Sequence, residues 1–230
     1  MPEKTKKEVQ PQAREYFEKG ITALRKDNLD YATKLFEQAL RREPGFFECR
    51  EALRLNQFKR VGKKSGFFKM FGKTTSTSLL PKGQLALKKD PLEAIEVAEQ
   101  ILNDDPYSVM GNKLLADAAT AADFPRTAVF AWDLVMKHQS GDKSNTMKYC
   151  QALVNSGDVA KAEETCPALA KAHPGDQEVL QLSKNLTASR TLSEGGYDKV
   201  ASGESDYRAV LKDEAEAVLQ IGRASCRERV

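Results

Sequence analysis

AIEVAEQI at residues 94–101 has two counterparts later in the chain, AVFAWDLV at residues 128–135 and AEETCPAL at residues 162–169. Each stretch begins with an alanine thirty-four residues after the previous one, and has small or apolar residues four and seven positions later. These offsets place the three side chains on one face of an α-helix. A period of about 34 residues is typical of helix–turn–helix repeats that stack into a solenoid. The spacing therefore predicts an all-α solenoid and argues against an enzyme.

An earlier stretch of the chain has the same helical face and adds further anchors. The full set combines an aromatic residue, small residues, a phenylalanine and a closing proline: Tyr16, Gly20, Ala32, Phe36, Ala39 and Pro44. This order resembles the tetratricopeptide repeat (TPR), and the resemblance extends over roughly residues 13–189. It implies a right-handed solenoid of about four helical hairpins, with one degenerate repeat, that acts as a protein-binding scaffold without catalysis.

The repeat pattern also divides the first part of the chain. Residues 1–12 are charged and lack an apolar pattern, so we expect a disordered lead-in. Residues 13–60 contain the first repeat and one helix of a degenerate repeat, because the interval from Ala32 to Ala94 is sixty-two residues, six short of two periods. Residues 61–78 contain three glycines and a Ser/Thr run, and we expect a loop there in place of the missing helix.

Beyond residue 78 the solenoid is expected to resume. Residues 79–190 are predicted to form three TPR-like helix pairs and a capping helix, with Pro167 bending or splitting its helix. Residues 191–220 are predicted to be a loop and a truncated helix. Residues 221–230 resemble translated sequencing adapter, so the natural chain is expected to continue differently after about Gln220. Without them the chain loses three arginines and one glutamate, and its formal net charge falls from +3 to +1.

Composition excludes several classes of function. No run of about 18 apolar residues could span a membrane, and the N-terminus lacks the apolar core of a secretory signal, so a cytoplasmic protein is predicted. The small net charge disfavours nucleic acid as a partner. Cys49, Cys150 and Cys166 are predicted to be small buried residues rather than a disulfide framework or a redox pair. His138 and His173 lie at expected helix ends without neighbouring ligands, so no metal, cofactor or catalytic residue is predicted.

The predicted loop at residues 61–78 combines basic and aromatic side chains and contains no acid. Its candidate residues are Lys63, Lys64, Phe67, Phe68, Lys69, Phe71 and Lys73. Three roles are open: the phenylalanines fill the groove left by the missing helix, the loop contacts a partner protein or, as part of a peripheral membrane adaptor, an anionic membrane surface, or it stacks on single-stranded nucleic acid. Gly66 and Gly72 enclose five residues rather than the four of a P-loop, so nucleotide hydrolysis is not predicted.

The TPR resemblance implies that a partner binds on the concave face, which is lined by the first helix of each pair. Carried over to this chain, that face comprises Phe17, Ile21, Leu24, Arg25, Lys113, Asp117, Thr120, Met147, Gln151, Val154 and Asn155. Its mixture of apolar and amide side chains suits a partner helix or an extended peptide. TPR domains that clamp a peptide's C-terminal carboxylate have an asparagine at the position of Ile21, so such a clamp is not expected. The oligomeric state is left open.

Overall fold

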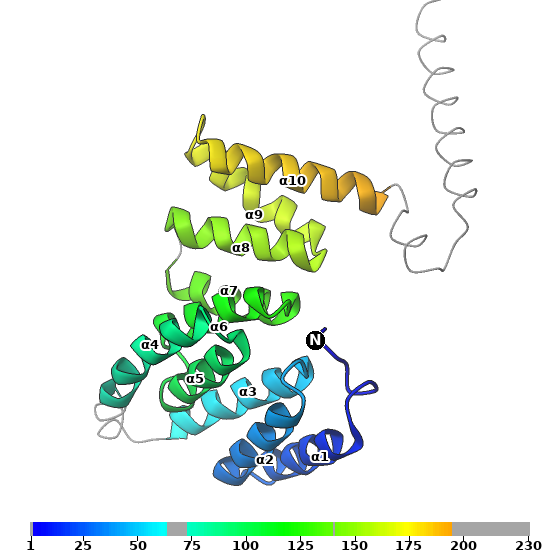
Figure 1. Cartoon of the computed structure of the whole chain (residues 1–230), viewed down its shortest axis with the longest axis vertical. Helices are drawn as coiled ribbons and strands as arrows, with labels where there is room; N and C mark the ends of the chain where they lie inside the picture. The colour runs from blue at the N-terminus through cyan, green and yellow to red at the C-terminus, as the bar shows by residue number, and fades with distance from the viewer. Residues whose placement is uncertain (1, 64–72, 140, 195–230) are drawn as a thin grey trace, which may run out of the picture. The chain divides into compact units, whose positions relative to one another are not determined.

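The structure is a computed structural model that describes residues 2–63, 73–139 and 141–194. These residues form ten α-helices, and the only β pairing among them is one isolated bridge between Lys4 and Phe46 (Figure 1). The helices are α1 (Pro11–Arg25), α2 (Leu29–Arg42), α3 (Phe47–Lys63), α4 (Lys73–Leu87), α5 (Pro91–Asp104), α6 (Val109–Ala121), α7 (Pro125–His138), α8 (Lys143–Ser156), α9 (Val159–Ala172) and α10 (Gln177–Glu194). The chain divides into two compact units, Met1–Ser156 and Gly157–Val230.

In the first unit, consecutive helices pack as pairs: α1 with α2, α4 with α5, and α6 with α7. The pairs then stack, because α5 packs on α6 and α7 packs on α8. The repeated alanines Ala94 and Ala128 are both buried, as small residues at close helix contacts must be. This array of stacked helix pairs confirms the predicted all-α, TPR-like fold.

Short polar residues fix where several helices begin. The side chains of Asn28, Asp90 and Ser108 each accept a hydrogen bond from a backbone N–H in the first turn of α2, α5 and α6 respectively. Pro91 and Pro125 lie at the start of α5 and α7, where a helix does not need the missing N–H. Because these starts are well defined, the connections stay short and consecutive helices lie side by side.

Helix α3 interrupts the regular stacking. It packs mainly on α2, whereas α4 packs on α5 and α6. The predicted loop at residues 61–78 is too long at both ends, because α3 continues to Lys63 and α4 begins at Lys73. The Ser/Thr run has low helix propensity but belongs to the first turns of α4 here. Further along α4, Gly83 lies so close to α6 that a Cβ there would be 2.3 Å from Leu114 Cδ2.

The second unit contains α9 and α10, which pack on each other. Pro167 was expected to bend or split its helix, and the split is wrong, because α9 runs without a break from Val159 to Ala172. Pro167 and Glu163, whose carbonyl loses its usual donor, are both exposed, so water can satisfy that carbonyl. Helix α10 extends to Glu194 rather than to residue 190. Residues 195–230, with the suspected adapter sequence, lie outside the described residues.

The N-terminal segment, residues 2–10, is ordered, so the predicted disordered lead-in is wrong. Val9 is only 2% exposed and belongs to the core around α1 and α2. The backbone N–H of Lys4 donates to the Gly45 carbonyl at 2.8 Å. Figure 1 shows the segment in dark blue leading into α1. Its charged side chains suggested a solvated tail, but several of them are held by specific partners in the fold.

Candidate functional site

Two of the predicted concave-face residues line one hollow in the first unit. Thr120 at the end of α6 and Asn155 at the end of α8 face a space of about 530 Å³, counting the part open to solvent. Its other walls come from the start of α7 and from α8: Asp123, Phe124, Pro125, Ala128 and Ala152. We call this space the α6–α8 hollow. Its accessible groups are the Thr120 hydroxyl, the Asn155 amide, the Asp123 carboxylate and the half-buried ring of Pro125, whereas Phe124, Ala128 and Ala152 are buried behind them.

The side chains near the α6–α8 hollow are tied together across the two helices. Lys148 Nζ lies 2.8 Å and 2.9 Å from the two carboxylate oxygens of Asp117, which links α8 to α6. Gln151 Nε2 donates to Asn155 Oδ1 at 2.8 Å along α8. The structure therefore brings together four of the predicted residues, Asp117, Thr120, Gln151 and Asn155, on neighbouring helices.

Two residues on this surface were missed by the sequence analysis. Met110 of α6 is 48% exposed, which is high for a large apolar side chain. It lies three, seven and ten positions before Lys113, Asp117 and Thr120, so the helical period alone could have added it to the predicted face. Lys148 was the second, and no pattern in the sequence distinguishes it from an ordinary surface lysine. Lys113, Met147 and Val154 are half-buried.

The predicted contribution of α1 to the binding face needs correction. Phe17 and Leu24 are 9% and 8% exposed and belong to the core, so neither offers surface to a partner. The Phe17 ring lies 4.9 Å from the Phe46 ring, measured between centroids. Phe46 and Val9 share that core, so the start of α3 and the N-terminal segment cover this face of α1. Ile21 is half-buried against the same core, and Arg25 is exposed.

A buried group of charges holds α3 against α5. Arg50 and Arg54 of α3 are each 1% exposed, and both donate to the buried carboxylate of Glu99 on α5, at 3.1 Å and 3.2 Å. Arg50 also donates to Thr127 of α7 and to the Pro44 carbonyl. Burial lowers the pKa of Arg54, and the charge of Glu99 opposes that shift. We call Arg50, Arg54 and Glu99 the ionic joint. The sequence did not reveal it, because charged residues on a helix usually face water.

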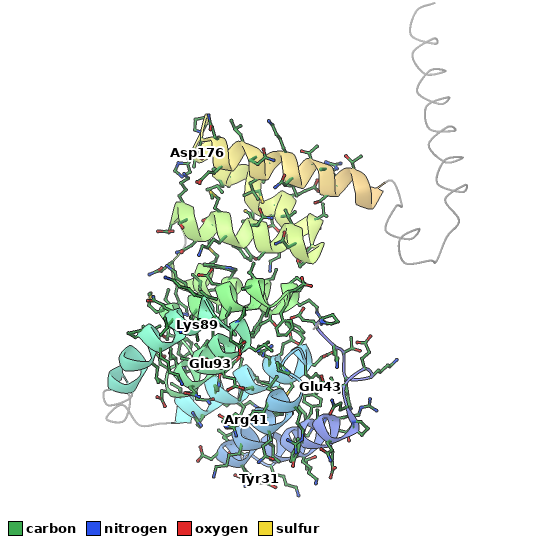
Figure 2. All side chains as sticks on the ribbon, viewed as in Figure 1. Tyr31, Arg41, Glu43, Lys89, Glu93 and Asp176 are labelled. Atoms are coloured by element: carbon green, nitrogen blue, oxygen red, sulfur yellow. The ribbon has the colours of Figure 1, made fainter. Side chains whose placement is uncertain are left out.

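A second hollow of about 550 Å³, counting open solvent, lies beside the ionic joint between α2, α3 and α5. Leu40, Leu53 and Ile95 are among its apolar walls, and Arg41, labelled in Figure 2, lies on its lining. Its charges are of both signs, since Glu37 and Glu96 also line it. Such mixed charge gives no single ligand chemistry a clear advantage.

Among the described residues, no group of three or more histidine, cysteine or acidic side chains could hold a metal ion. Cys49 is buried and donates to the Phe36 carbonyl at 3.5 Å, and burial raises the pKa of its thiol. A thiol that stays protonated is a poor nucleophile. None of the described helices is long and apolar enough to cross a bilayer.

We expect Cys49, Cys150 and Cys166 to resist iodoacetamide at pH 8 while the chain is folded. All three are buried, and no disulfide involves them. Peptide mass spectrometry after timed labelling would measure each site separately, with the chain unfolded in guanidinium as the fully labelled control. Fast labelling of any of the three in the folded chain would show that its helix opens readily.

The basic and aromatic candidates of the predicted loop lie largely outside the described residues. Residues 64–72 are not described, and neither are the side chains of Lys63 and Lys73. The partner-binding, membrane, nucleic-acid and groove-filling roles of this segment therefore remain predictions.

Comparisons with known proteins find only distant similarity. No family model matches the chain, and no curated protein matches it. Among solved structures, the complex of the TPR2AB domain with pHSP90 from yeast Sti1 is similar at a TM-score of 0.40 and 14% identity. The match covers 76% of this chain and 69% of that one. Similarity this distant transfers no ligand, so the function has to be inferred from the residues of this chain.

Proposed function

We propose that this chain is a non-catalytic scaffold that binds a peptide or helix of a partner protein on the surface formed by α6 and α8. The observation that supports this most directly is the α6–α8 hollow, where Thr120 and Asn155 lie beside the half-buried Pro125. The exposed side chain of Met110 adds an apolar contact on α6. Methionine suits a binding surface because its flexible side chain adapts to different partners.

The residues of this surface suggest how a partner would be held. The Asn155 amide and the Thr120 hydroxyl can donate to and accept from a peptide backbone, while the half-buried ring of Pro125 offers apolar contact. The Lys148–Asp117 pair is solvent-accessible, so it is worth only about 0–1 kcal/mol and can exchange partners at low cost. Binding would therefore depend on a few anchors rather than on the whole array.

Asn155→Arg tests this proposal. A long charged side chain at the edge of the α6–α8 hollow should reduce partner capture from source-cell lysate at least tenfold. Because Asn155 is exposed, the free energy of unfolding should change by less than about 0.5 kcal/mol. Capture is measured by quantitative mass spectrometry on the full chain, and folding by circular dichroism.

Gln100→Arg is the matched control, since it also exchanges an exposed amide for arginine but lies on the hollow beside the ionic joint. It should leave capture unchanged. If Gln100→Arg abolishes capture and Asn155→Arg does not, the partner binds between α2, α3 and α5, and the α6–α8 surface is the wrong site.

A further inference from the structure

The N-terminal segment is bound to the rest of the first unit much as a peptide ligand would be. The Glu3 carboxylate lies at the N-terminus of α7, where it accepts from the N–H of Arg126 and of Thr127, both at 2.8 Å, and from Thr127 Oγ1 at 2.6 Å. The residue preceding α7, Phe124, provides no side-chain cap of its own. A residue more than 120 positions away thus satisfies donors that a local serine or aspartate usually satisfies.

A buried carboxylate depends on the same segment. Glu43, which follows α2 and is labelled in Figure 2, is only 1% exposed. Its side-chain oxygens accept from Lys4 Nζ at 2.8 Å and from the Gln10 N–H at 3.2 Å. Both donors belong to the N-terminal segment. Without that segment, a buried negative charge would lose an ammonium partner, and uncompensated buried charges are costly.

Backbone contacts complete the binding site. The Lys4 N–H donates to the Gly45 carbonyl at 2.8 Å, as a neighbouring strand would. A Cβ on Gly45 would lie 2.8 Å from the Pro2 carbonyl oxygen, so the missing side chain leaves room for the passing chain. Glu43, Gly45, Arg126 and Thr127 therefore form a site for an extended Glu-Lys pair, which we call the Glu-Lys cradle.

We propose that the Glu-Lys cradle is an exchangeable peptide-binding site, occupied by the chain's own N-terminal segment, that accepts from a partner protein an extended segment with an acidic residue directly followed by lysine. Each part of the cradle recognises one of these groups. The backbone N–H groups at the α7 N-terminus donate to the carboxylate, and the Glu43 carboxylate pairs with the ammonium. A peptide without the lysine leaves buried Glu43 without its ammonium partner, and one without the carboxylate leaves the part-buried donors of Thr127 unpaired.

The way the segment is anchored allows residues 2–4 to be exchanged without unfolding. Val9 is buried, and Arg14 donates to the carbonyls of Lys6, Lys7 and Val9, so the later part of the segment is fixed independently of the cradle. Lys4 is partly exposed, with 27% of its side chain accessible. A tethered segment competes at an effective concentration in the millimolar range. A peptide added in solution therefore binds weakly unless the tethered segment binds the cradle less tightly or the peptide is in large excess.

The test uses a fluorescently labelled peptide of residues 2–8 (PEKTKKE) and the full chain. In a Glu3→Gln, Lys4→Ala double variant, the chain's own segment no longer fits the cradle. Fluorescence anisotropy should show that this variant binds the peptide at least tenfold more tightly than the unmodified chain does. Lys7→Gln, an exposed position in the same segment, is the matched control and should bind as weakly as the unmodified chain.

Two further comparisons separate specific binding from charge attraction. A peptide with the pair reversed (PKETKKE) has the same composition and should bind the double variant at least tenfold more weakly. Adding Gly45→Val should abolish binding of the original peptide. The proposal is overturned if the folded double variant binds both peptides equally or neither. Should the double variant not fold, Lys4→Ala alone replaces it, and unchanged peptide affinity in that folded variant also overturns the proposal.

Discussion

Glu99→Gln is expected to destabilise the first unit by about 3–5 kcal/mol, since it removes one member of a buried charge group and leaves the others uncompensated. Arg50 and Arg54 are fully buried and both donate to the Glu99 carboxylate. Glutamine keeps the size of the side chain but removes its charge, so two buried guanidinium groups would remain without an anion between them. The effect therefore tests charge compensation rather than packing.

Urea unfolding followed by the fluorescence of Trp132 would measure this change. Trp132 is the only tryptophan of the chain, is buried, and lies in the first unit, so it reports on the part that contains the ionic joint. Glu96→Gln, on the same helix but exposed, is the matched control and should change stability by less than about 0.5 kcal/mol. Equal shifts of the unfolding midpoint in both variants would mean that the joint contributes nothing specific.

Phe36→Ala is expected to cost a similar amount, about 3–5 kcal/mol, because it leaves a large cavity between α1 and α2. The Phe36 ring is fully buried, 6.1 Å from the Phe17 ring between centroids. It also lies directly against Gly20, where a Cβ would be 2.5 Å from Phe36 Cε1. Chemical denaturation followed by circular dichroism would measure the loss.

Gly20 and Phe36 also allow a sharper test, because the effect of Gly20→Ala on the free energy of unfolding should change sign when Phe36 is replaced by alanine. In the unmodified chain, Gly20→Ala should destabilise, because overpacking of about 1–3 kcal/mol exceeds the roughly 1 kcal/mol gained in helix propensity. In the Phe36→Ala background the clash is gone, so Gly20→Ala should stabilise instead. Gly62→Ala, where a Cβ meets nothing within 4 Å, serves as the control. If Gly20→Ala has the same effect in both backgrounds, Phe36 does not explain the glycine.

The features that could be predicted from the sequence are those that repeat or act locally. Ala94 and Ala128 are buried because the regular stack of the first unit places equivalent residues in equivalent contacts, and Ala162 is buried in the second unit. The close approach of Gly20 and Phe36 follows from the first repeat in the same way. On the candidate surface, Asp117, Thr120, Gln151 and Asn155 were implied by the TPR resemblance, which assigns binding to the first helix of each pair.

What could not be predicted depends on partners distant in sequence. In the sequence, Glu3 looks like part of a solvated tail and Arg50 like an ordinary surface charge. In the structure, the start of α7 lies beside Glu3 and the Glu99 carboxylate lies beside Arg50. Phe17 was assigned to the binding face because the regular solenoid would expose it, whereas the N-terminal segment and α3 cover it here. Each of these errors comes from long-range packing, which a periodic pattern does not encode.

The separation between Glu3 and its partners has a consequence during protein synthesis. Glu3 and Thr127 are 124 positions apart. At the usual 5–20 residues per second, the ribosome adds Thr127 about 6–25 s after Glu3. Throughout that interval the Glu-Lys pair of a nascent chain is made but has no complete cradle to enter, since Arg126 and Thr127 are still missing. Each newly made molecule thus exposes this short sequence to other proteins before its own fold can cover it.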